Sequence, residues 1–281
     1  MEVRQDSAHA HQIILIPAAA TSSAFTRATE EYLVCDLGSD KIYVVTYSEE
    51  SGWGIVSVYE TTPGYGPRHA VIKAISSSPA ASTVKPDEAE DVELAVYVVN
   101  ELSCMITGHK VLRNPTRLST PFFTPISTLP PVDHVSGTGS KVDLEGYTPQ
   151  DPMETIACAI LLVPSSSDSE TGSQELLVTN RNLPLEISPE RDPWSVFPLG
   201  PSGEIVGPGR FYFGAGRHLR GVGLEKRDPA RLLIASREGD GFTLYQQPKA
   251  KREETGGWEE LGRGLLQDEK EIELPLAIDW L

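Results

Sequence analysis

The sequence lacks any hydrophobic run close to the roughly 20 residues that a membrane-spanning helix requires. Residues 1–6 carry acidic and basic side chains in place of the apolar core of a signal peptide. Only three cysteines occur, Cys35, Cys104 and Cys158, each within or beside a strand-like apolar run. This small, odd number favours buried thiols in a reducing compartment over disulfides, with a catalytic thiol as the alternative. We therefore expect a cytoplasmic protein without membrane contact.

Basic residues are also scarce, since 24 Lys and Arg stand against 40 Asp and Glu, for a net charge of −16. A field of this sign repels phosphate backbones, so we expect no nucleic-acid partner. A small anionic substrate stays compatible with it where a few arginines converge. The sequence has neither a P-loop nor a G-x-S-x-G elbow, so we expect no cofactor. His9 and His11 are spaced like a metal pair, but no cluster supplies a third ligand, so we expect no metal.

Turn-forming residues are abundant, with 24 Gly and 22 Pro, which indicates short strands and few long helices. Runs of apolar and β-branched residues, bounded by turn signals, recur in the same order in four blade-like repeats at about 9–64, 66–153, 154–213 and 216–281. Four copies of a four-strand unit predict an all-β fold, a partial β-propeller that forms one domain over 1–281. A β-sandwich with long loops is the competing fold.

Three segments stand apart from this pattern. Residues 76–91 and 114–153 read as polar surface loops, the second with one edge strand at 122–126. Residues 272–280 form a last strand-like piece with no partner after it, which fits closure of a propeller by the opposite end of the chain.

A basic residue and a carboxylate bracket two strands of the second repeat. Arg68 opens the first strand and Glu101 follows the second. Because the chain reverses between antiparallel strands, the two side chains are expected at the same end of one sheet. They are interpreted either as an ion pair at the strand ends or as part of a catalytic site, and both can hold.

Six segments together resemble the lactonase family of seven-bladed propellers, which includes propeller-type 6-phosphogluconolactonases and fungal carboxy-cis,cis-muconate cyclases. They occur in the family's order, at 10–15 (AHQIIL), 36–42 (DLGSDKI), 66–69 (GPRH), 97–103 (YVVNELS), 178–181 (VTNR) and 219–221 (LRG). The pairing of GPRH with VVNEL is the most specific element. The segments resemble the last four of the family's seven blades, so the N-terminal blades are expected to be absent. Such an arc leaves sheet edges open, and the chain is then a fragment, a truncated product or one that self-associates to cover the edges.

The resemblance implies a catalytic set that matches the muconate cyclases: His11, Arg68, Glu101 and Arg181. It places His69, Asn180 and Arg220 at substrate-binding positions. Arginines bind carboxylate or phosphate in two-point fashion, and a Glu–His set can exchange protons near neutral pH. The alternatives are structural: His69 faces away from Arg68 and fits a packed histidine, and Arg181 fits a salt bridge to a neighbouring blade.

The resemblance implies an enzyme of carbohydrate or related metabolism, either a lactone hydrolase or a cycloisomerase, that acts on a small anionic lactone or a muconate-like acid. Hydrolysis and cyclisation both stay open. A tailoring cyclase or isomerase of secondary metabolism, and a non-catalytic remnant or scaffold, are the alternatives.

Overall fold

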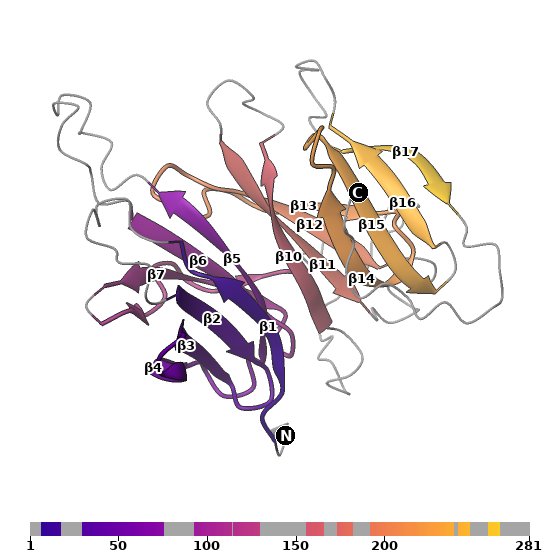
Figure 1. Cartoon of the computed structure of the whole chain (residues 1–281). Helices are drawn as coiled ribbons and strands as arrows, with labels where there is room; N and C mark the ends of the chain where they lie inside the picture. The colour runs from indigo at the N-terminus through magenta and orange to yellow at the C-terminus, as the bar shows by residue number, and fades with distance from the viewer. Residues whose placement is uncertain are drawn as a thin grey trace, which may run out of the picture. The chain divides into compact units, whose positions relative to one another are not determined.

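The computed structural model describes residues 7–17, 30–75, 93–113, 115–129, 156–165, 173–181, 192–238, 241–247 and 258–264. All regular structure in these ranges is β-strand, and the strands form four antiparallel sheets (Figure 1). The predicted all-β class and the partial propeller are therefore confirmed. Within the same ranges, no helix is long and apolar enough to cross a membrane.

Each sheet consists of strands that pair in the order in which they follow along the chain. The first contains β1 (Ala10–Leu15), β2 (Glu30–Asp36), β3 (Lys41–Ser48) and β4 (Gly52–Glu60). The second contains β5 (Pro67–Ile75), β6 (Glu93–Asn100), β7 (Met105–Leu112) and β8 (Arg117–Leu118), and β9 (Ile126–Ser127) also pairs with β7. The third contains β10 (Ile156–Pro164), β11 (Gln174–Arg181), β12 (Pro193–Pro198) and β13 (Arg210–Phe213). The fourth contains β14 (Arg217–Leu224), β15 (Arg231–Glu238), β16 (Phe242–Gln246) and β17 (Glu259–Gly264).

The chain divides into two compact units. The first comprises Met1–Ile126 with Leu199–Ile205, and the second comprises Ser127–Pro198 with Val206–Leu281. The first two sheets belong to the first unit and the last two to the second. The single-domain organisation over 1–281 stays a prediction.

In the first unit, the sheets β1–β4 and β5–β8 share one apolar core. Alternate residues of β2 and β3 face this core, because successive side chains of a strand point to opposite faces. Leu33, Ile42 and Val44 are almost fully buried there, against Val96 and Val98 of β6. This packing joins the sheet that contains His11 to the sheet that carries Arg68.

In the second unit, Trp194 is the largest side chain that is fully buried. It stacks on Tyr212 with ring centroids 4.2 Å apart and packs with Leu177, Leu219 and Ile234. One aromatic centre therefore holds the third and fourth sheets together.

Three predicted segments have different outcomes. The edge strand predicted at 122–126 is wrong in extent, because only Ile126–Ser127 is strand. Phe122 and Phe123 are ring-packed on each other and on Tyr97 instead. The loop at 76–91 and the terminal strand at 272–280 lie outside the described residues.

Candidate active site

A β-bulge lies near the start of the first strand in every sheet. The register shifts between Ala10 and Gln12 in β1, between Pro67 and His69 in β5, and between Leu219 and Gly221 in β14. The residues inside these shifts are His11, Arg68 and Arg220, three of the predicted site residues. A bulged residue leaves the regular alternation and is re-aimed, and bulges are common beside active sites. In β10 the corresponding shift contains Cys158 and Ala159 instead.

Arg68 and Glu101 form a buried ion pair in the first unit. The Arg68 Nη1 group donates a hydrogen bond to Glu101 Oε2. The two side chains are only 9% and 8% exposed. Both charges can be buried to this depth because each neutralises the other. The pairing predicted from strand geometry is therefore present.

A series of hydrogen bonds from Asp40 through Gly66 to Glu101 fixes the backbone around this pair. The Asp40 carboxylate accepts hydrogen bonds from the Gly64 and Gly66 amides at 2.8 and 2.7 Å. The Gly66 carbonyl in turn accepts the Glu101 amide at 2.7 Å. Gly66 has a φ of 63°, in the left-handed region that glycine adopts without strain. Asp40 is therefore a positioning residue for Glu101 that sequence reasoning missed, although its place in a tight turn was evident.

His11 lies in the same unit, on a strand adjacent to the one that carries Arg68. Its ring is 4.7 Å from that of His9, centroid to centroid. The neighbouring Gln12 side chain accepts the Ala70 amide at 2.5 Å, which ties β1 to the start of β5. Among the described residues, no group of three or more His, Cys, Asp or Glu could hold a metal ion.

Arg181 lies in the second unit beside a histidine that sequence reasoning also missed. Arg181 Nη1 is 3.5 Å from His218 Nε2, and both residues are buried. His218 has a φ of 56°, an uncommon backbone state for a non-glycine residue. The fully buried Asp192 holds it there by accepting the His218 amide at 2.5 Å. The signal was present, since Arg217-His218-Leu219 repeats the pattern of Arg68-His69-Ala70.

Burial and four nearby arginines lower the pKa of His218 to about 4. Burial is the main cause, and the surrounding guanidinium groups follow in the order Arg220, Arg181, Arg237 and Arg217. The imidazole is therefore neutral at pH 7. A neutral ring nitrogen can accept a hydrogen bond from Arg181.

The remaining predicted residues differ in their surroundings. Asn180 is fully buried and exchanges hydrogen bonds with Thr128: it donates to the Thr128 carbonyl at 2.9 Å and accepts from the hydroxyl at 2.7 Å. This pairing gives Asn180 a structural anchor. His69 is half-buried and stands opposite Val99 in the ladder. The Arg220 carbonyl lies 3.9 Å from Cys158 Sγ, and all three cysteines are buried thiols that form no disulfide.

Solved structures with a similar arrangement include a protein from Lactobacillus plantarum, which is 21% identical with a TM-score of 0.55. The match covers 93% of this chain and 56% of that protein, so the chain spans little more than half its length. An exo-β-1,3-galactanase from Phanerochaete chrysosporium is 9% identical, with a TM-score of 0.45, over 91% of this chain and 50% of the enzyme. No curated protein matches the sequence.

The sequence itself gives the most direct comparison. The family model described as "Lactonase, 7-bladed beta-propeller" matches residues 1–145, which contain His11, Arg68 and Glu101. The chain therefore belongs to the lactonase family of seven-bladed β-propellers.

Proposed function

We propose that the chain is a lactonase-type enzyme that acts on a small anionic lactone or on a muconate-like acid. The observation that carries the proposal is the buried Arg68–Glu101 pair at a bulge, within the part of the sequence that matches the family. Burying two charges in place of apolar side chains contributes little net stability, which favours a functional reason for the pair. Glutamate is one of the side chains that serve as a general acid or base when they lie within hydrogen-bond reach of the reacting group.

In lactone hydrolysis, Glu101 would accept a proton from a water molecule as the water oxygen adds to the lactone carbonyl. The ring C–O bond then breaks, and the departing oxygen takes a proton, for which His11 is the donor that we propose. Arg68 would orient Glu101 and stabilise negative charge on the former carbonyl oxygen.

In cyclisation, the same acid–base group serves a different bond change. A substrate carboxylate oxygen adds to a conjugated double bond, and a proton is delivered to the neighbouring carbon. Atoms are conserved in this isomerisation, so no co-reactant is required. We propose Glu101 as the acid–base group in either reaction.

We propose that Arg181 binds an anionic group of the substrate. The support is the group of four arginines whose charges help to lower the pKa of the buried His218. A guanidinium is suited to a carboxylate or phosphate because its planar fork matches two oxygens. Acidic residues outnumber basic ones in the chain, so a local group of four arginines stands out from the overall composition.

The test is to incubate the purified chain with 6-phosphogluconolactone and, separately, with 3-carboxymuconate. Proton release would report hydrolysis, and loss of the dienoate absorbance would report cyclisation. Turnover of one substrate, with an Arg181→Gln variant raising KM by about 10-fold or more, is expected. Turnover of neither substrate would contradict the proposal for these compounds and favour the non-catalytic alternative.

A further inference from the structure

Arg181 and His218 lie on neighbouring strands of the second unit. Arg181 is the last residue of β11, and His218 is the second residue of β14. Arg181 Nη1 lies 3.5 Å from His218 Nε2, and the two residues are only 6% and 8% exposed. A guanidinium offers donors and no acceptor, so the imidazole Nε2 accepts this hydrogen bond. The ring proton of the neutral imidazole is therefore on Nδ1.

The backbone that carries His218 is held in an uncommon conformation. Gly216 has a φ of 98° and His218 a φ of 56°, both in the left-handed region. The buried Asp192 holds this segment at two points, because its amide donates to the Gly216 carbonyl at 2.8 Å and its carboxylate accepts the His218 amide at 2.5 Å. A non-glycine residue persists in such a conformation only where its surroundings fix it, and these residues cluster at functional sites. Asp192 therefore fixes the place from which the imidazole reaches Arg181.

An imidazole acts on a guanidinium differently from a carboxylate. Glu101 orients Arg68 and also neutralises it. A neutral imidazole contributes an acceptor but no negative charge, so its contact orients Arg181 and leaves the positive charge intact. A long, flexible side chain loses rotamer freedom when it binds a ligand, and orientation beforehand reduces that cost. The contact between Arg181 and His218 is thus of the kind that prepares an arginine for an anion.

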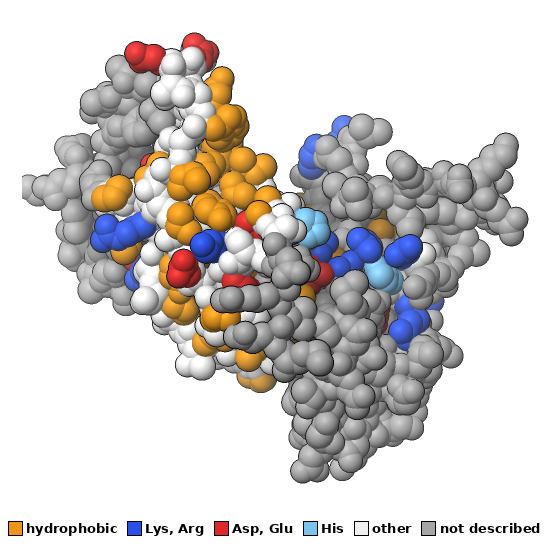
Figure 2. All heavy atoms as spheres, turned by 90° about the horizontal axis from the view of Figure 1, so that it is seen from below, with side chains coloured by type: hydrophobic (Ala, Val, Ile, Leu, Met, Phe, Trp, Pro, Cys, Tyr) orange, Lys and Arg blue, Asp and Glu red, His pale blue; other side chains and the backbone are white. Residues whose placement is uncertain are grey.

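The surroundings of His218 keep its ring in the accepting form. Burial first, and then the charges of Arg220, Arg181, Arg237 and Arg217, lower the pKa of the imidazole. The ring therefore stays neutral, and Nε2 stays an acceptor, over the pH range in which lactones and their acids are handled. In Figure 2, Lys and Arg side chains gather beside a histidine on one part of the face in view. Guanidinium groups brought together in this way favour a small anion.

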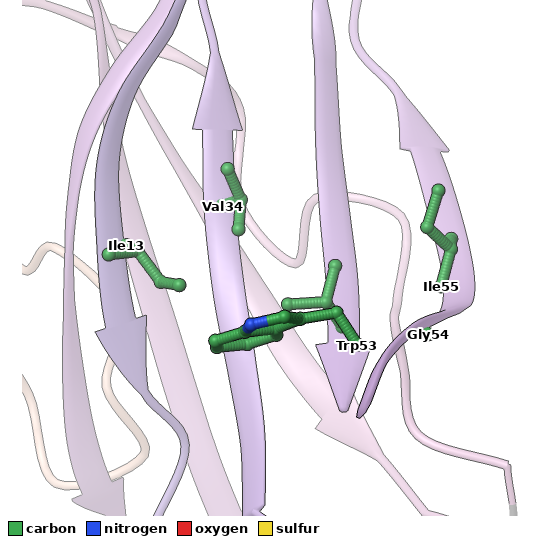
Figure 3. Close-up of a pocket in the computed structure, with 6 residues that line it drawn as sticks. Ile13, Val34, Trp53, Gly54 and Ile55 are labelled. Atoms are coloured by element: carbon green, nitrogen blue, oxygen red, sulfur yellow. The ribbon is translucent and has the colours of Figure 1, made fainter. Parts of the chain in front are cut away.

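Two hollows in the first unit are unsuited to an anion. One, of about 300 Å³, is lined by apolar side chains such as Ile13, Trp53 and Ile55 (Figure 3). The other, of about 330 Å³, is lined by two carboxylates, those of Asp40 and Glu60, and by the one ammonium group of Lys41. Binding of a small anion therefore reports on the arginines around His218 and not on these hollows.

We propose that His218 is a positioning residue, whose Nε2 atom orients the Arg181 guanidinium toward a phosphate or carboxylate group of the substrate while Asp192 holds the imidazole in place. This inference rests on the proposed function, in which Arg181 binds that anionic group. His218 acts through Arg181 and takes no part in the bond changes.

The test is the binding of inorganic phosphate to the full chain, measured by titration calorimetry. The side-chain oxygen of glutamine reaches as far as Nε2 of histidine, whereas that of asparagine reaches only as far as Nδ1. His218→Gln keeps an acceptor for Arg181, so its Kd should stay within about 2-fold of wild type. His218→Asn suits the left-handed backbone better but loses the acceptor, so its Kd should rise about 3- to 10-fold. A purely structural role of His218 would reverse this order.

Two arginine variants calibrate the measurement. Arg181→Gln should raise the Kd for phosphate at least about 10-fold, because it removes the guanidinium itself. Arg263→Gln is the matched control, since Arg263 lies on β17 of the same unit and pairs with Glu260 at 2.8 Å. It makes the same change in net charge and should leave the Kd unchanged. The melting temperature of each variant shows whether it folds.

Nitrogen NMR of the wild-type imidazoles gives a second readout that needs no folded variant of His218. The ring of His218 should carry its proton on Nδ1, with Nε2 unprotonated. Arg181→Gln should shift the Nε2 resonance of that ring, because the donor is lost. His109 is an internal standard, since its Nδ1 lies 2.9 Å from the Ser119 carbonyl and must donate to it.

The outcomes separate this inference from the proposed function. Phosphate binding that Arg181→Gln weakens, but that His218→Asn retains as well as His218→Gln does, would overturn the inference and leave the proposed function standing. A proton on Nε2 of His218 would do the same. Phosphate binding that Arg181→Gln leaves unchanged, or no binding by the wild type, would overturn both. Bound phosphate without turnover of either proposed substrate would contradict only the proposed catalysis.

Discussion

Replacing Arg68 by methionine should destabilise the protein far more than breaking an exposed ion pair. The substitution keeps most of the side-chain volume but leaves Glu101 buried, at 8% exposure, without its charge partner. Breaking a buried pair from one side costs about 3–5 kcal/mol. Melting temperatures of domains of this size shift by about 2–4 °C per kcal/mol, so we expect a loss of roughly 10 °C.

The loss of stability in the Arg68→Met variant should depend on pH in a defined direction. In the Arg68→Met variant, burial without a partner raises the pKa of the Glu101 carboxyl in the folded state above its unfolded value. The folded variant then binds the proton more tightly than the unfolded chain, so its free energy of unfolding relative to wild type recovers as the pH is lowered. Adding Glu101→Gln to Arg68→Met should restore part of the loss at neutral pH.

The assay is urea unfolding of each variant from pH 5 to pH 8, followed by circular dichroism. Lys41→Met is the control, because Lys41 and Glu60 pair at 36% and 77% exposure and such pairs contribute at most about 1 kcal/mol. If Arg68→Met lost no more stability than Lys41→Met, the account of a buried, mutually dependent pair would be refuted.

Three further predictions concern single sites. Gly66→Ala should destabilise by about 1–3 kcal/mol in urea unfolding, because φ is positive and the new Cβ would lie 2.7 Å from Leu102 Cγ; a stability equal to wild type would contradict this. The pKa of His218, lowered to about 4, implies that the folded state binds fewer protons than the unfolded state, so stability should fall as pH decreases from about 6.5 to 4. Asparagine tolerates the positive φ, so His218→Asn should reduce this loss of stability at low pH. An unchanged pH profile in the variant would contradict protonation of His218 as the cause. Burial raises the pKa of the Cys35 thiol to about 12, so thiol reagents at pH 8 should label it only after unfolding, and rapid labelling of the folded chain would argue against that burial.

Local sequence pattern accounts for most of the strands. Alternation placed β2 and β3 correctly, and the turn between them carries the residues that a hairpin needs. A glycine inside a strand is unfavourable, yet β7 forms around Gly108. The reason is tertiary: a Cβ at Gly108 would lie 2.1 Å from Phe123 Cε1, so the ring occupies the space beside the strand.

The candidate site was predictable only in part. Arg68 and Glu101 could be paired from the sequence because chain reversal alone brings their strand ends together. The bulge that re-aims Arg68 is a property of register, which a single strand does not reveal. Asp40 and Asp192 act through backbone amides far away in the sequence, so nothing in their own segments pointed to that role.

The central claim is that Glu101 transfers protons during turnover, and its most direct measurement is kcat/KM of Glu101→Gln on whichever of the two substrates the wild type converts. Loss of general acid–base catalysis should lower kcat/KM by about 100- to 10,000-fold. Glu60→Gln, at a largely exposed carboxylate, should leave it unchanged. A folded Glu101→Gln protein with wild-type kcat/KM would contradict the account.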